Sequence, residues 1–423
     1  MLLSKSLIAL AACFLPLIAS AAELQLRNAA AKNVAADSYI VVYKDIDDST
    51  FESEMFDVRS FLLSKRDTTF KGLGHKYKMS KFKGYQIEAD MDTVNKISQS
   101  PNVAYIDKDV KVSAYELSVR IGAPWGLDRI SHRYGISHRD GISHRNGTSH
   151  RNGTSKGLEE YTYDSSAGQG TTIYIIDTGV NIKHEEFEGR AKWGANFIAG
   201  SVDADEDGHG THVAGVAAGK TYGVASKANI VAIRVLDANG DGKGSDVLAG
   251  MQWAADAAAY KNQTGKSVIN MSLGAEYSDA INKATEAIIA SGVVVVAAAG
   301  NEDMNVSRVS PASAPDVITV GATDRNDARA EFSNWGAALD VFAPGVDILS
   351  AWIGSNTAFK TISGSSMACP HISGLAAYFI GLETNGTSTP AKISAKIKKV
   401  ATKGVVTDMR NSTNNLAYND NGY

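Results

Sequence analysis

Apolar segments alternate with amphipathic ones from Gly168 to the C-terminal region. The apolar segments are short and nearly uninterrupted, which is typical of strands that are buried on both faces. They span residues 172–177, 230–235, 268–272, 293–299 and 317–320. Helical periodicity lies between and after them, over residues 209–219, 246–260, 280–291, 366–381 and 390–401. The alternation predicts an α/β fold, with a parallel sheet covered by helices on both faces.

A smaller unit precedes this region. Residues 39–43 alternate as a strand, residues 50–64 form a polar helical stretch, and residues 103–106 form a later strand. These elements predict a small α+β domain in front of the larger one.

The N-terminus has the pattern of a signal peptide. Lys5 precedes an apolar run over residues 7–18, and Ala19, Ser20 and Ala21 are small residues suited to cleavage after Ala21. No later stretch reaches the roughly 18 apolar residues of a membrane span. We therefore expect residues 1–21 to be removed and the protein to be secreted, and a vacuolar destination is equally compatible with the sequence.

A hexapeptide of the form Ile-Ser-His-Arg-x-Gly repeats from Ile130 to Gly157. Its copies hold four of the nine histidines, which is one feature of a metal-binding tract. No carboxylate or cysteine recurs in register, and little is apolar beyond the leading residue. We interpret the segment as a solvated insert, at residues 130–157, without a core of its own.

The overall composition narrows the function classes. Lys and Arg number 42 against 46 Asp and Glu, for a net charge of -4, so there is no general basic field for nucleic acid or acidic membranes. The two cysteines, Cys13 and Cys369, are too few for a disulfide framework or a Cys-type zinc site.

Three reactive residues stand where predicted strands or helices begin or end. Asp177 closes the first strand, His209 lies between two glycines at a helix start, and Ser366 opens a long apolar helix. His209 and His212 also have the spacing of a metal pair on one helix face, but the glutamate of a zincin motif is missing. The order Asp, His, Ser along the chain is the order of the subtilisin triad.

These segments resemble the subtilase family, and most closely its proteinase-K-like fungal branch. The resemblance is carried by Ala-Pro-Trp-Gly-Leu at 123–127, Asp-Thr-Gly at 177–179, His-Gly-Thr-His at 209–212, Asn-Met-Ser-Leu-Gly at 270–274 and the segment around Ser366. It covers the chain from Ala123 onward. It implies an inhibitor-type propeptide over residues 22–115 and a monomeric peptidase domain over residues 116–423.

The resemblance implies a serine endopeptidase that works through an acyl-enzyme on protein and peptide substrates. Asp177 would orient His209, His209 would accept the proton of Ser366, and Asn301 would donate to the oxyanion together with the Ser366 backbone N–H. An extended substrate would be bound by Gly240, Gly242, Ser272, Leu273, Gly274 and Gly300. Small apolar walls imply broad specificity with a hydrophobic or aromatic preference.

The family also implies a structural calcium ion, held here by the backbone carbonyls of Pro315 and Val317 and by the Asp340 side chain. No metal takes part in the bond breaking. A second, weaker calcium site is not expected, because Val405 stands where relatives have an aspartate. The propeptide would act as chaperone and inhibitor until the precursor cuts itself between about Val110 and Ile121.

Alternatives stay open from the sequence. One alternative is an adhesive or binding protein that keeps an inactive subtilase scaffold and displays the hexapeptide repeat, although the intact set of Asp177, His209, Asn301 and Ser366 speaks against it. Glycosylation sequons start at Asn146, Asn152, Asn262, Asn270, Asn305, Asn385 and Asn411. Of these, Asn270 is the least suited, because it lies in a predicted core strand.

Overall fold

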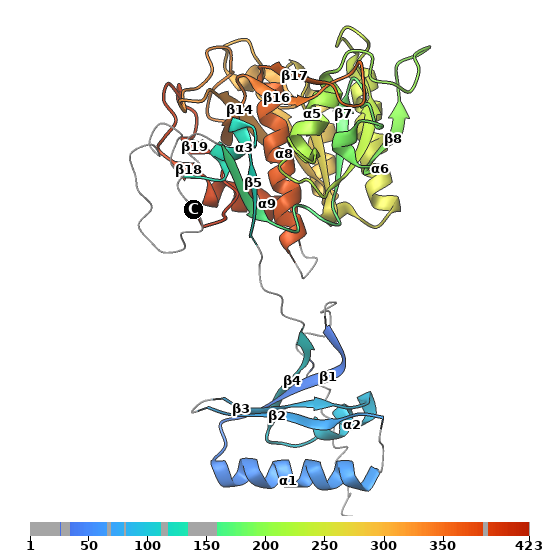
Figure 1. Cartoon of the computed structure of the whole chain (residues 1–423), viewed down its shortest axis with the longest axis vertical. Coiled ribbons are helices and arrows are strands. Elements are labelled where there is room, and N and C mark those ends of the chain that lie inside the picture. The colour runs from blue at the N-terminus through green and yellow to red at the C-terminus, as the bar shows by residue number, and fades with distance from the viewer. Residues whose placement is uncertain are drawn as a thin grey trace, which may run out of the picture. The chain divides into compact units, whose positions relative to one another are not determined.

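The computed structural model describes residues 34–65, 69–79, 82–110, 117–133, 159–383 and 388–422, together with Leu26. The chain divides into two compact units, residues 1–113 and residues 114–423 (Figure 1). The predicted signal peptide and the repeats from residue 134 to 157 lie outside the described residues. No helix in the described part of the chain is long and apolar enough to cross a membrane.

The first unit is a four-stranded antiparallel sheet with two helices, which confirms the predicted α+β class and adds two strands and one helix that the sequence did not predict. The strand order is β2 (Gly72–Met79), β3 (Phe82–Glu88), β1 (Val34–Tyr43) and β4 (Val103–Val110). The helices are α1 (Asp48–Lys65) and α2 (Met91–Ile97). Phe51 of α1 is fully buried against the sheet, where its ring meets Tyr43 edge-on at 5.4 Å.

The second unit contains a nine-stranded sheet that is parallel except where β18 meets β19. Its strands, in spatial order, are β18 (Thr402–Lys403), β19 (Asn415–Leu416), β15 (Val341–Pro344), β14 (Ile318–Thr323), β12 (Val294–Ala298), β10 (Ser267–Met271), β7 (Thr172–Asp177), β9 (Asn229–Arg234) and β8 (Ala191–Asn196). The five predicted strands form the centre of the sheet.

Side chains of the central strands alternate between two apolar clusters, one on each face of the sheet. In β7, Ile173 and Ile175 pack on one face, while Tyr174 and Ile176 pack on the other. The first face is covered by α5 (His209–Ala218), α8 (Ser365–Leu382), α9 (Pro390–Val400) and α3 (Trp125–Ile130). The second is covered by α6 (Gly244–Tyr260) and α7 (Asp279–Ala290). The predicted fold class is therefore confirmed.

Helix ends follow local capping chemistry. The Thr389 side chain accepts the Lys392 N–H ahead of Pro390, and the Ser278 side chain accepts the Ile281 N–H at the start of α7. Short elements that the sequence did not predict complete the unit. They are β5 (Leu117–Ile121) with β6 (Glu160–Asp164), β11 (Ala275–Glu276) with β13 (Val309–Ser310), β16 (Ile348–Ala351) with β17 (Phe359–Ile362), and the 3-10 turns Glu185–Phe187, Thr264–Lys266 and Val306–Arg308.

Candidate active site

The carboxyl edge of the parallel strands brings Asp177 and His209 together. Asp177 ends β7 and is fully buried, and His209 begins α5 with its side chain one-quarter exposed. His209 Nδ1 lies 2.8 Å from Asp177 Oδ1, which also accepts the Thr178 N–H at 2.7 Å. Asp177 Oδ2 is buried and has no hydrogen-bond partner among the described residues. The His209 imidazole is therefore the main side-chain partner of the Asp177 carboxylate.

The surroundings of His209 raise its pKa above the ordinary value. Burial of the ring acts in the opposite direction and lowers the pKa, but the charge and hydrogen bond of Asp177 outweigh it, helped by Asp207 and Asp205. Because Nδ1 faces the carboxylate, a neutral imidazole carries its proton there and presents Nε2 as a base. This is the tautomer that accepts a proton from a nucleophile.

A second buried carboxylate, Asp205, ties the end of β7 to the start of α5. Its Oδ1 accepts the Thr178 hydroxyl and the Gly208 N–H, both at 2.8 Å, and its Oδ2 accepts the Thr211 N–H at 2.9 Å. The Thr178 hydroxyl in turn accepts the Gly210 N–H at 2.9 Å. Sequence reasoning missed this residue, because its role depends on contacts with β7.

The spacing of His209 and His212 fits a metal pair, but in the structure His212 has other partners. Its Nε2 lies 3.0 Å from Ile348 O and 3.1 Å from Lys360 O, and burial lowers its pKa to about 3. His209 Nδ1 faces Asp177, so the two rings direct these nitrogens at different partners. Within the described residues, no group of three or more His, Cys, Asp or Glu side chains is placed to hold a metal ion.

Ser366 lies in the first turn of α8, which packs against α5. Its hydroxyl donates to the carbonyl of Ser272 at 3.0 Å, not to His209. Pro370 has no N–H for the carbonyl of Ser366 four residues before it, and the Ser272 hydroxyl donates to that carbonyl at 2.8 Å. The proline thus leaves the Ser366 carbonyl free to accept this hydrogen bond, which ties the start of α8 to the segment after β10.

Asn301, in the loop after β12, has a defined amide orientation. Its Oδ1 accepts the Ser365 N–H at 2.8 Å, which leaves Nδ2 available as a donor. A Cβ built on Gly364 would lie 3.5 Å from Asn301 Nδ2 and 3.6 Å from Ser366 N. Two groups that carry N–H donors, the Asn301 side-chain amide and the Ser366 backbone, therefore lie close to the same space beside Gly364.

A cleft of about 430 Å³ extends from His209 along the second unit. The predicted residues Gly240, Gly242, Ser272, Leu273 and Gly274 all line it. Three larger apolar side chains that the sequence did not single out also line it, those of Leu236, Val247 and Ile281. The cleft also carries charge of both signs, from Asp207, Asp241 and Lys243.

Gly300 is not among the residues that line this cleft, and a backbone constraint explains why it is glycine. Its φ is +99°, and a Cβ there would lie 2.3 Å from Asn334 Nδ2 and 2.6 Å from Glu302 Oε2. Its N–H donates to Ser365 Oγ at 3.1 Å. Gly300 therefore lets the loop that carries Asn301 pass between Asn334 and the start of α8.

The Asp340 carboxylate has two partners within the protein. Oδ2 accepts the Thr319 N–H at 3.0 Å, and Oδ1 lies 3.1 Å from the Lys398 ammonium. Lys398 is itself 42% exposed, so its side chain has room to move away. Carboxylate oxygens are ligands that calcium prefers, and in this structure the Lys398 ammonium lies beside one of the two Asp340 oxygens.

The subtilase family model matches residues 168–418, and the peptidase inhibitor I9 model matches residues 38–115. The chain is 78% identical to subtilisin-like protease 3 of Pseudogymnoascus destructans over the full length of both. It is 43% identical to alkaline protease 1 of Aspergillus flavus, covering 90% of this chain and 91% of that protein. The crystal structure of a cold-adapted subtilisin-like serine proteinase matches with TM-score 0.60 and 41% identity, over 70% of this chain and 98% of that one.

Proposed function

The chain belongs to the subtilase family as a subtilisin-like serine protease with an I9-type propeptide, and we propose that Asp177, His209 and Ser366 are its catalytic triad. The observation that carries this proposal is the 2.8 Å contact between His209 Nδ1 and Asp177 Oδ1 at the cleft. It prepares His209 Nε2 to act as a base, and α8, which packs against α5, carries Ser366 in its first turn.

In the first half of the reaction, Ser366 Oγ attacks the carbonyl carbon of the scissile peptide bond while its proton moves to His209 Nε2. Asp177 stabilises the imidazolium that forms, in line with the raised pKa of His209. The Ser366 hydroxyl must first leave the carbonyl of Ser272, since catalytic hydrogen bonds often form only when substrate binds.

The negative charge on the substrate oxygen is met by Asn301 Nδ2 and the Ser366 N–H, which border one space beside Gly364. The carbon–nitrogen bond then breaks, and His209 gives its proton to the leaving amine. Water attacks the acyl-enzyme and gives its proton to His209. The ester bond then breaks, and His209 returns the proton to Ser366 Oγ.

We assign the cleft to an extended peptide that lies between the segments 240–242 and 272–274, as an added strand. Leu236, Val247 and Ile281 favour hydrophobic or aromatic side chains. Asp207 and Asp241 would attract basic residues, but Lys243 offsets this attraction. Broad specificity with an apolar preference is the specificity that we propose.

Secretion rests on the signal-like residues 1–21. A precursor that inhibits itself is proposed from the I9-type domain. Residues 117–121 form strand β5, which is fully paired with β6, and Arg120 donates to Thr221 O at 2.8 Å. A peptide bond within this paired strand would have to leave the sheet before it could be cut, so we place processing within residues 111–116.

Asn262 and Asn411 are exposed sequons suited to glycosylation, whereas Asn270 is fully buried.

We propose one structural calcium ion at Pro315, Val317 and Asp340, bound when Lys398 moves away from the carboxylate. When bound, the ion supplies electrostatic bracing of this loop. It lies outside the groups that we assign to catalysis, so chelation is expected to change stability more than turnover.

Labelling with a serine-directed phosphonylating reagent tests the proposed function. Peptide mapping of the mature enzyme is expected to find one modified residue, Ser366, with loss of peptidase activity in proportion. Ser365 provides the matched control, because it is the preceding residue and its hydroxyl accepts a backbone N–H. An unlabelled Ser366 in a folded, processed protein would instead support the alternative of an inactive scaffold that displays the repeat.

A further inference from the structure

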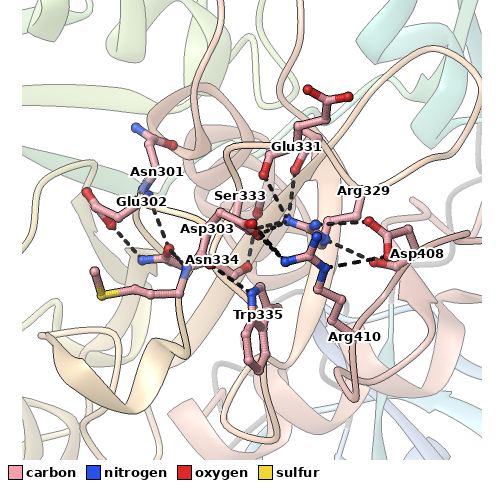
Figure 2. A network of polar contacts seen from close by, with 12 residues as sticks. Asn301, Glu302, Asp303, Arg329, Glu331, Ser333, Asn334, Trp335, Asp408 and Arg410 are labelled. Carbon is pink, nitrogen blue, oxygen red and sulfur yellow. Dashed lines mark hydrogen bonds and ion pairs between the residues drawn. The ribbon is translucent and has the colours of Figure 1, made fainter.

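A buried asparagine, Asn334, lies against the loop that carries Asn301. It is fully buried, and its amide makes four hydrogen bonds to that loop. Nδ2 donates to Ala299 O at 2.9 Å and to Glu302 Oε2 at 2.7 Å (Figure 2). Oδ1 accepts the N–H groups of Glu302 at 3.1 Å and Met304 at 2.9 Å. Both donors and both acceptor positions of the Asn334 amide are thus used in hydrogen bonds to one loop.

Glu302 extends this contact to the backbone of Asn301. The same Oε2 that accepts from Asn334 also accepts the Asn301 N–H at 3.0 Å. On the other side of the loop, the Asn334 N–H donates to Gly300 O at 3.0 Å. Asn301 is therefore fixed at its backbone by Glu302 and Asn334, and at its side chain by the Ser365 N–H.

The segment that holds Asn334 is itself braced by a buried arginine. The Arg329 guanidinium is fully buried and donates to Ala330 O at 3.1 Å and to Ser333 O at 2.5 Å. It also lies 3.1 Å from Asp303 Oδ1, an aspartate that Arg410 contacts at 2.7 Å. Figure 2 shows these groups as one network that continues from Arg329 to Asn301. The segment that carries Asn334 is therefore itself fixed by hydrogen bonds and ion pairs of Arg329.

We propose that Asn334 and Glu302 are positioning residues for the oxyanion hole. They hold Asn301 so that its Nδ2 meets the developing oxyanion without further movement of the loop. The inference rests on the proposed function, in which Asn301 donates to the oxyanion. Neither residue is proposed to touch the substrate.

The role has a kinetic signature. The oxyanion exists only in the transition state and the intermediates, so misplacing its donor lowers kcat and leaves KM nearly unchanged. Loss of the donor itself in Asn301→Ala is expected to lower kcat by about 10²–10³. Misplacing the donor in Asn334→Ala is expected to lower kcat by about tenfold. Glu302→Ala is expected to show a smaller loss in the same direction.

Glu302→Gln is the conservative control. Its amide oxygen can still accept from Asn301 and Asn334, so near-normal kcat is expected, whereas Glu302→Ala removes the acceptor. All variants are made as the full precursor, and kcat and KM are measured on a chromogenic peptide after active-site titration. Equal losses in Glu302→Gln and Glu302→Ala would overturn the role of the carboxylate oxygen as an acceptor.

The double variant Asn301→Ala/Asn334→Ala decides between positioning and general structural support. If Asn334 acts through Asn301, the double variant is no slower than Asn301→Ala alone. Multiplied losses, or a raised KM in Asn334→Ala, would overturn the proposal. Should Asn334→Ala fail to fold, the same cycle is run with Glu302→Ala, because Glu302 is exposed. Unchanged kcat in Asn301→Ala would overturn the oxyanion assignment itself, a failure distinct from a multiplicative double variant.

Discussion

The inhibitor unit and the protease unit of this chain place their charges differently. In residues 34–110, Lys76 pairs with Glu52 and Lys78 with Asp48 on the surface, around a single apolar cluster. Surface pairs of this kind are screened by water and contribute little. In the protease unit, Arg129 is fully buried and contacts Asp327 at 2.7 Å and 2.9 Å, with a large apolar cluster on each sheet face.

The difference matches the fates proposed for the two units. A small domain with one core has little stability to lose, which suits a segment that is cut and discarded. Buried charge requires full hydrogen bonding, which suits a unit that must hold catalytic groups in place.

Ser366→Ala is expected to leave the two units joined. Loss of the nucleophile costs about 10⁶ in turnover in subtilisin, so self-processing should stop while the precursor still folds. Gel analysis and N-terminal sequencing of the purified precursor check this outcome. As a control, a trace of mature wild-type enzyme added in trans should cut the variant. Normal maturation without added protease would contradict the triad assignment.

Asp177→Asn is expected to lower kcat by about 10⁴, because the uncharged amide no longer favours the productive tautomer of His209. Activity needs the neutral imidazole, so in the wild type kcat/KM should rise with pH around a midpoint above the usual histidine value of about 6.5. Removal of the carboxylate should move that midpoint to lower pH. A pH–rate profile in which the midpoint does not move would show that Asp177 does not set the pKa of His209.

Phe51→Ala is expected to destabilise the inhibitor unit by about 3–5 kcal/mol, the usual range for emptying a buried phenylalanine site. Hydrogen exchange of the Ser366→Ala precursor should show fast exchange in residues 34–110 and unchanged protection in residues 159–383. Phe56→Ala on the same helix is the control, because Phe56 is 71% exposed. Loss of protection in both units would mean that they unfold together.

Chelation of calcium is expected to lower the melting temperature of the mature enzyme with little change in initial rate. A site filled at about 100 times its dissociation constant stabilises the fold by roughly 2.7 kcal/mol. Asp340→Asn should mimic the chelator, and Lys398→Ala should increase the response to calcium by removing the competing cation. A melting temperature that ignores calcium in all three proteins would refute the site.

Deletion of residues 136–153, three periods of the repeat, is expected to change kcat/KM by less than about twofold, as for a surface insertion. The flanking segments have their own anchors, since Arg133 donates to Val400 O at 3.2 Å and the Asp128 carboxylate accepts the Glu160 N–H at 3.1 Å. Steady-state kinetics with the full-length enzyme as reference checks this. Lost activity in a folded deletion variant would assign the repeat a role in catalysis.

The sequence predicts the centre of the protease sheet well and its margins poorly. Central strands such as Thr172–Asp177 are buried on both faces, and continuous apolar runs identify them. Edge strand Ala191–Asn196 mixes Lys, Trp and Gly, so it has no such signal. Strands β5 and β6 pair across a long intervening segment, and local patterns carry no information on that pairing.

The same limit applies to the candidate site. Asp177, His209 and Ser366 stand in short motifs with recognisable spacing, and the structure does bring Asp177 to His209. Asp205 and Asn334 are single polar residues whose partners are remote in sequence or belong to another element. Lys398 near Asp340 is also a long-range contact. Such residues acquire their meaning only when the chain has folded.

The only cysteine of the mature protease, Cys369, can report how often the folded protein opens. Its thiol is fully buried in α8, contacts Asn270 Oδ1 at 3.3 Å, and has a pKa raised by burial to about 12. It is therefore nearly inert in the native state. Once residues 1–21 are removed, no other thiol remains in the chain. The rate of modification by a thiol reagent then measures how often the fold opens transiently. The same opening exposes this protease to digestion by its own copies.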